Sequence, residues 1–307
     1  MAENILQEME KQMNEFKNYH PIVNFIYFIF IIGFTMFFMN PVCLCFSLLG
    51  GFTYSIMING KKAIKTNIIY MLPAIILGAV MNPAFNHQGV TILLYLPSGN
   101  PLTLESILYG ICASVMIVSV ICWFSCYTAV MTSDKFVYLF GRIIPALSLV
   151  LSMILRFVPQ FIQQTKKTAE ARRCVGKDLS NGGIIQRAKN GLSVLSIMIT
   201  WALENSIDTA DSMKSRGYGL KGRTAFSIYR FDNRDKTALL IIGVLGLYIL
   251  AGGFLDGMYF RYFPSIRWGG FSSYNLSVFI AYLILCFVPV IVEVWEELRW
   301  KSLKSGI

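Results

Sequence analysis

Six long apolar blocks run through this sequence, separated by polar segments. They cover residues 22–39, 42–58, 68–81, 106–130, 238–254 and 276–294. A helix needs about 20 predominantly apolar residues to cross the hydrocarbon core of a bilayer, so most of these blocks have the length of transmembrane helices. Only 14% of the residues are charged, whereas soluble domains average about 25%. The sequence therefore predicts an all-α, polytopic membrane protein with about six transmembrane helices.

Positive charge is concentrated between the fourth and fifth blocks. Residues 135–236 hold seventeen of the 27 Lys and Arg residues, and the short loop 59–65 holds three lysines. Because loops rich in Lys and Arg stay on the cytoplasmic side, we expect both segments inside the cell. Six crossings of the cell membrane then leave both termini cytoplasmic. The expected organisation is helices 1–4 in residues 1–131, a cytoplasmic region in 132–236 and helices 5–6 in 237–307.

Three further segments are placed by their charges. Residues 82–103 contain no Lys or Arg and are rich in Pro, Gly and Asn, so we expect an external loop with one strand-like or re-entrant piece at 90–96. Residues 256–275, with two arginines, form a second external loop. The N-terminal segment 1–20 carries four glutamates and lacks the basic start of a signal peptide. We expect it to form a short cytoplasmic lead-in helix.

The apolar blocks carry almost no ionisable groups. Secondary transporters and proton pumps usually place such groups inside the bilayer. Here Glu105 stands at the edge of the fourth block, and we expect its carboxylate to snorkel to the membrane interface. No phosphate-binding loop or hydrolase motif occurs. Seven cysteines without paired spacing and two histidines predict no metal site. We therefore expect no catalytic residue, cofactor or metal ligand.

The net charge of +10 also has to be interpreted by its location. In a soluble protein it would suggest nucleic acid as a partner, but in a membrane protein it reports which segments face the cytoplasm. We expect the bilayer, and no nucleic acid, among the partners. The apolar stretches 143–155 and 192–203 within the basic segment are too short to cross the membrane. They are expected to be interfacial or intraprotein helices.

Two helices in the basic segment are predicted to end in the same way. The first, 160–176, has Arg172 and Arg173 shortly before a glycine, and the second, about 186–216, ends in Ser215-Arg216-Gly217. Two interpretations remain open. Arginine in a last turn complements the helix dipole, and glycine is the commonest helix stop. Alternatively, each arginine projects into a groove of a partner and pairs with a carboxylate through its planar guanidinium group.

Glu204, Asp208 and Asp211 share one face of the second predicted helix. Their spacing of four and three residues places the carboxylates along one side. A solvated face is one explanation. The other is that one carboxylate pairs with Arg172 or Arg173 and fixes the crossing of the two helices.

Five short motifs resemble those of a known family. They are Tyr19-His20-Pro21, Asn40-Pro41, Lys61-Lys62, Leu155-Arg156-Phe157-Val158-Pro159 and, most specifically, the stretch from Ala210 to Gly219. On these motifs the chain resembles the transmembrane T component of energy-coupling factor (ECF) transporters, relatives of the Q subunit of cobalt importers. The resemblance extends over most of the chain.

The resemblance implies a coupling role. In that family two long cytoplasmic coupling helices end in motifs centred on arginine, typically Ala-Arg-Gly, that dock into two ATP-binding-cassette (ABC) ATPase subunits. Ser215-Arg216-Gly217 matches this pattern, which implies docking by Arg216. The first motif departs from it, because Val175 precedes Gly176 and the arginines are Arg172 and Arg173. ATP-driven motion would then tilt a separate substrate-binding membrane subunit, the S component, for uptake of a vitamin or metal ion.

Two other function classes compete with this interpretation. The chain could be a self-sufficient secondary transporter whose basic segment is attached to anionic lipids. In that case Arg216→Lys would be tolerated, because attraction to lipid headgroups needs only charge. A polytopic membrane enzyme would require a catalytic constellation, and the sequence offers none. The coupling interpretation makes the chain a non-enzymatic subunit.

Overall fold

The computed structural model describes residues 15–95, 101–141, 144–177, 183–218, 220, 229–270 and 272–304. Residues 1–14, most of the predicted lead-in helix, lie outside this range. The chain forms two compact units, one of Met1–Thr132 with Tyr229–Ile307 and one of Ser133–Ile228. Each unit is described by itself.

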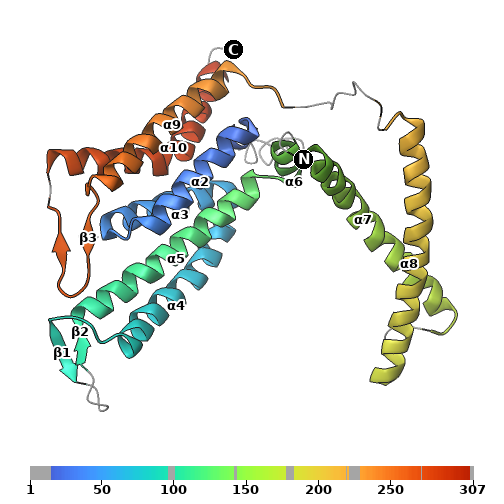
Figure 1. Ribbon diagram of the computed structural model, residues 1–307, viewed down its shortest axis with the longest axis horizontal. Helices are drawn as coiled ribbons and strands as arrows, with labels where there is room; N and C mark the ends of the chain where they lie inside the picture. Colours follow the sequence, from blue (N-terminus) through green and yellow to red (C-terminus); the bar gives the residue numbers. More distant parts are fainter. Residues whose placement is uncertain are drawn as a thin grey trace. The chain divides into compact units, whose positions relative to one another are not determined.

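The described part of the first unit is a bundle of six apolar helices (Figure 1). Helix α5 packs against α2, α3 and α4, and α10 packs against α3 and α9. Five of the six are long and apolar enough to cross a membrane, and α2, with 17 residues, is the shorter one. The predicted all-α polytopic architecture is therefore confirmed. The helices are α2 (Pro21–Phe37), α3 (Pro41–Asn59), α4 (Lys61–Phe85), α5 (Leu104–Val130), α9 (Asn233–Phe254) and α10 (Ser273–Lys304).

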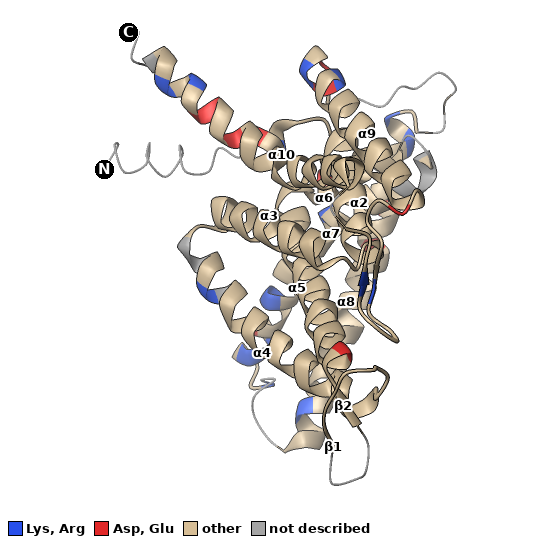
Figure 2. Cartoon of the chain, turned by 90° about the vertical axis from the view of Figure 1, so that its left-hand side faces the viewer, with Lys and Arg blue, Asp and Glu red and all other residues tan. Residues whose placement is uncertain are grey.

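Charged residues in these helices are concentrated near the helix ends. Figure 2 shows the helices of the bundle mostly in tan, with Lys, Arg, Asp and Glu gathered towards helix ends. Many large apolar side chains on α4, α5, α9 and α10 point outwards and are exposed. A bilayer supplies the apolar surroundings that such an outer surface needs.

Aromatic side chains fill the centre of the bundle. Trp123 of α5 is fully buried and packs edge-on against Tyr27 and Phe28 of α2. Its indole nitrogen donates to the Ser47 hydroxyl of α3 at 3.0 Å. The Ser47 hydroxyl also lies 2.6 Å from that of Thr35, so the buried polar groups satisfy one another.

Asp235 ties the start of α9 to the start of α2. Its buried carboxylate accepts from the backbone N–H of His20 at 3.0 Å and from that of Asp232 at 3.1 Å. The neighbouring guanidinium of Arg234 lies 4.4 Å from the centre of the Tyr19 ring. The resembling motif at Tyr19-His20-Pro21 therefore marks the point where the chain re-enters the bundle after the second unit.

The third helix of the bundle is longer than predicted. The block 68–81 becomes α4, which runs from Lys61 to Phe85 and includes Pro73 and Pro83. The predicted loop 59–65 is thus wrong from Lys61 onwards. Gly60 adopts φ +66°, which ends α3 and lets α4 begin at the next residue without a longer connection.

Within the described residues, two β-hairpins lie in the loops between helices of the bundle. The predicted strand-like piece at 90–96 is confirmed for residues 92–95, which form β1 (Ile92–Tyr95) and pair antiparallel with β2 (Pro101–Thr103). The loop between α9 and α10 contains a pair that was not predicted, β3 (Phe260–Arg261) with β4 (Arg267–Trp268). Tyr262 anchors this second hairpin, because its hydroxyl donates to the Met39 carbonyl at 2.7 Å.

Glu105 does not snorkel to the interface as predicted. Only 2% of its surface is exposed, at the first turn of α5. Its carboxylate accepts from the Thr91 hydroxyl at 2.8 Å and from the Thr91 backbone N–H at 3.2 Å. The donors that a snorkelling carboxylate would find in water are supplied here by the loop that leads into β1.

The described residues of the second unit form one short and two long helices. They are α6 (Ser133–Gly141), α7 (Pro145–Cys174) and α8 (Ile184–Ser215). The sequence predicted separate helices at 143–155 and 160–176, but α7 is continuous through Pro159. A proline removes one backbone hydrogen bond and kinks a helix more readily than it ends one when the flanking residues are helical. The stretch 192–203 is likewise internal to α8.

Candidate functional site

Helices α7 and α8 cross as an antiparallel pair within the second unit (Figure 1). Near one end of the contact the Phe161 and Trp201 rings meet edge-on with centroids 5.3 Å apart. Further along, the Thr168 hydroxyl lies 3.9 Å from the Met198 sulfur. We call this contact, from Phe161–Trp201 to the end of α7, the α7–α8 crossing.

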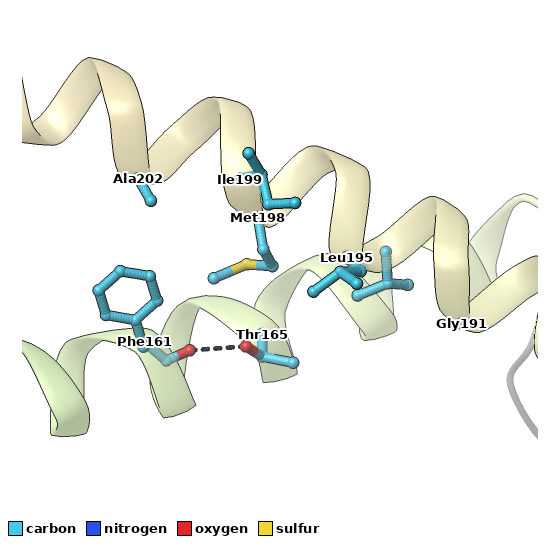
Figure 3. A pocket seen from close by; sticks show the side chains of 8 residues that line it. Phe161, Thr165, Gly191, Leu195, Met198, Ile199 and Ala202 are labelled. Carbon is cyan, nitrogen blue, oxygen red and sulfur yellow. Dashed lines mark hydrogen bonds between the residues drawn. The ribbon is translucent and has the colours of Figure 1, made fainter.

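An apolar groove of about 370 Å³ follows the crossing. Figure 3 shows Phe161 and Thr165 of α7 on one side and Leu195 and Met198 of α8 on the other, and Ile199 also lines the groove. The Thr165 hydroxyl donates back to the Phe161 carbonyl at 2.7 Å, so this polar group is satisfied within its own helix. The groove can therefore accept an apolar surface without leaving a hydroxyl unpaired.

The two long helices end with the same backbone hydrogen bonds. At the end of α7, Gly176 N–H donates to the Arg173 carbonyl at 3.0 Å and Lys177 N–H to the Arg172 carbonyl at 3.0 Å. At the end of α8, Gly217 N–H donates to the Lys214 carbonyl at 2.9 Å and Tyr218 N–H to the Met213 carbonyl at 3.0 Å. Both ends are Schellman motifs.

Both glycines have positive φ, +79° at Gly176 and +76° at Gly217. This left-handed conformation is one that glycine adopts at no steric cost. The predicted shared ending is therefore confirmed. With the two glycines Gly176 and Gly217 aligned, Val175 corresponds to Arg216. The position that Arg216 occupies at the end of α8 is thus held by valine at the end of α7.

Arg216 is exposed at the C-cap of α8. The hydroxyl of Ser215, the preceding residue, donates to the Ser212 carbonyl at 2.9 Å. This hydroxyl is therefore satisfied within α8 and leaves a carboxylate of a partner to Arg216. Gly219, the last residue of the resembling stretch, lies outside the described residues. An arginine on an exposed helix end can present its planar group to a carboxylate without first breaking a contact of its own.

The two candidate arginines of the first arm differ in their surroundings. Arg172 is half-buried and its Nη1 donates to the Ser193 hydroxyl of α8. Arg173 is exposed. Arg172 therefore contributes to the α7–α8 crossing, and Arg173 is the more accessible of the two. Sequence reasoning could not separate them, because the partner Ser193 lies on the other helix and has no distinctive pattern around it.

The three carboxylates of α8 lie away from Arg172. Glu204, Asp208 and Asp211 are all exposed. Arg172 contacts α8 at Ser193, and Glu204 stands about 16 Å further along that helix. Arg172 thus donates to a serine and not to one of these carboxylates. For Arg172 this agrees with the other alternative, that the three carboxylates form a solvated face. Pairing of a carboxylate with Arg173 stays a prediction.

The two helix ends are far apart. The end of α7 lies beside Ser193, near the start of α8, whereas Arg216 caps the other end of the same helix. At the rise of an α-helix, Ser193 and Arg216 are separated by about 35 Å. The two arginine-bearing ends therefore cannot contact a single small pocket, but they can contact two separate protein domains.

Among the described residues, no cluster of three or more His, Cys, Asp or Glu side chains could hold a metal ion. The titratable groups of the crossing are mostly exposed arginines, lysines and carboxylates. Chemically, the described part of the second unit offers an apolar groove and two cationic helix ends, which suit binding to other proteins.

Comparison with known proteins gives consistent matches. The model of the family CbiQ, described as "Cobalt transport protein", matches residues 14–226, more than two thirds of the chain. The chain is 38% identical over 104 residues to the "Energy-coupling factor transporter transmembrane protein EcfT" of Lactobacillus helveticus, covering 32% of this chain and 38% of that protein. It is 35% identical over 111 residues to the protein of the same name from Exiguobacterium sibiricum, covering 35% and 42%. The matched regions span about two fifths of the length of these relatives.

Proposed function

Because the chain belongs to the CbiQ family of cobalt transport proteins, we propose that it is the transmembrane coupling subunit of an ECF-type ATP-driven importer. The observation that carries this proposal is the pair of matching helix ends. Each presents an exposed arginine close to a left-handed glycine, and the two lie about 35 Å apart along α8.

In this proposal the two ends dock onto two ABC ATPase subunits. Arg216 inserts into one subunit, and Ser215 and Gly217 shape the helix end that enters the groove. Arg173 serves the other subunit, because its side chain is exposed whereas that of Arg172 is half-buried. Truncating an arginine at the centre of such an interface commonly removes a large share of the binding free energy. Arg172 is then a positioning residue that holds α7 on α8.

The crossing would transmit the motion of the ATPases. Contacts at Phe161–Trp201, Thr168–Met198 and Arg172–Ser193 join the two helices along their overlap. Because of these contacts, a displacement of either arginine-bearing end also moves the other helix, and both helices tilt about the α7–α8 crossing. The apolar groove in Figure 3 supplies a surface on which a separate membrane subunit, the S component, could be tilted.

We further propose that the substrate, a vitamin or metal ion, is selected by that S component. The described helices of the bundle line no cluster of metal-binding side chains. The chain itself then carries out no reaction, and both of its termini lie on the cytoplasmic side with the α7–α8 crossing. The domain organisation follows the same topology, with residues 132–236 as the cytoplasmic coupling region.

Capture of ATPases by the detergent-solubilised chain tests this proposal. We expect the wild-type protein to retain two ATP-binding subunits and the Arg173→Ala variant to retain fewer. Arg172→Ala should loosen the α7–α8 crossing, which faster hydrogen exchange around Ser193 would show. If no ATPase is retained and the chain alone moves a solute in vesicles, the chain is a secondary transporter whose basic segment binds lipid.

A further inference from the structure

The β1–β2 hairpin carries an exposed apolar surface that the coupling function does not use. All four residues of β1, Ile92 to Tyr95, are exposed, and Leu94 and Tyr95 are 70% and 68% accessible. Val90 shortly before them is exposed as well. Neither face of this strand is covered by the described part of the chain.

The hairpin is nevertheless firmly attached to the bundle. Beside the contacts of Glu105 with Thr91, the Thr103 hydroxyl donates to the Gln88 carbonyl at 2.8 Å. The Ser106 hydroxyl donates to the Asn86 carbonyl at 2.6 Å. These bonds join both ends of the hairpin to the first turn of α5. They fix the position of the apolar strand, which stays exposed and does not pack onto the bundle.

The composition of this segment is unusual for a loop in water. From 82 to 103 it contains no Asp, Glu, Lys or Arg. The β3–β4 hairpin differs in composition, because it carries Arg261 and Arg267. It also differs in its attachment, which is made through the buried Tyr262. The first hairpin therefore presents an uncharged, apolar surface, whereas the second carries two exposed arginines.

The exposed strand lies close to the end of α4, because its partner strand β2 contacts that helix. Helix α4 leads directly into the loop, and its outward residues Val80, Met81 and Phe85 are exposed at that end. In a membrane-spanning helix such residues face lipid. The three lysines of α4 stand at its opposite end, so by the positive-inside rule the hairpin lies at the outer boundary of the bilayer.

We propose that the β1–β2 hairpin inserts its apolar side chains into the interfacial region of the outer leaflet and binds lipid there. A two-stranded sheet leaves the N–H and C=O groups of its outer edges unpaired. Such groups need water, so the hairpin cannot lie in the hydrocarbon centre of the bilayer. The headgroup boundary supplies water for these edges and apolar chains for Leu94. Tyr95 is a residue type enriched at that depth.

Fluorescence quenching in lipid nanodiscs tests the proposal. The exposed thiols are first removed by Cys45→Ser and Cys174→Ser, since the remaining cysteines are buried. A single cysteine is then placed at Leu94 or Tyr95 and labelled with an environment-sensitive fluorophore. Arg267→Cys on the second hairpin is the matched control, because that residue is also exposed but charged.

We expect blue-shifted emission at Leu94→Cys and Tyr95→Cys, quenching by a lipid carrying a spin label near its headgroup, and weak quenching by iodide. Arg267→Cys should show the reverse. Strong iodide quenching at either position of the first hairpin would overturn the proposal, and so would shielding from both quenchers, which would mean that protein covers the strand. The measurement requires no ATPase, so its outcome is independent of the coupling function.

Discussion

Replacing Arg216 with alanine should weaken binding of the ATPase subunits about 30-fold, the equivalent of about 2 kcal/mol. The guanidinium is exposed at the C-cap of α8, so its removal costs the fold little and the interface much. Arg216→Lys should recover only a small part of the loss, because an ammonium group cannot form the paired hydrogen bonds of a guanidinium with a carboxylate. Titration of labelled ATPase against the solubilised chain measures the change.

Lys214→Ala is the matched control for this prediction. Lys214 is an exposed cation in the same turn, and its backbone carbonyl keeps its hydrogen bond to Gly217 in the variant. Groove docking predicts that Lys214→Ala binds nearly as well as the wild type. If the Lys214 and Arg216 variants lose equal affinity, or if Arg216→Lys is fully active, only charge matters and the docking proposal is wrong.

Adding a methyl group at Gly110 should destabilise the bundle by about 1–3 kcal/mol. A Cβ at Gly110 would clash with the Gly78 carbonyl oxygen of α4, and backbone atoms cannot move aside as a flexible side chain can. Helix α4 packs mainly against α5, so Gly110→Ala pushes the two helices apart where small residues let them approach. Denaturant unfolding in detergent micelles measures the loss.

Gly33→Ala separates this steric effect from the general effect of replacing glycine in a helix. Gly33 lies in α2, and a Cβ there would meet no atom within 4 Å. Alanine in an open helical position gains up to about 1 kcal/mol over glycine. We therefore expect Gly33→Ala to be neutral or stabilising. Equal stability of the two variants would mean that the α4–α5 contact is looser than the structure shows.

The features that were predicted from sequence depend on neighbouring residues. The shared endings of α7 and α8 follow from a basic last turn and a glycine, both of which act locally. The helices of the bundle follow from the length of the apolar blocks. The strand predicted within 90–96 and found at Ile92–Tyr95 follows from β-branched and aromatic residues between Gly and Pro.

The features that were missed depend on contacts between distant residues. Glu105 is buried because Thr91, on the preceding loop, supplies its donors. Arg172 is a packing residue because α8 places Ser193 beside it. The β3–β4 hairpin is held by Tyr262 on the carbonyl of Met39, which belongs to the far N-terminal part of the chain. The sequence also predicted two separate helices, 143–155 and 160–176, where α7 is continuous through Pro159.

ATP-driven uptake in reconstituted vesicles tests the coupling function most directly. The chain is incorporated with its two candidate ATPases and an S component, and entry of the substrate is followed with ATP on the ATPase side. The coupling account predicts uptake that needs ATP and all of these subunits, and that is lost in Arg216→Ala although the variant is stably inserted. Uptake by the chain alone, without ATP, would contradict it.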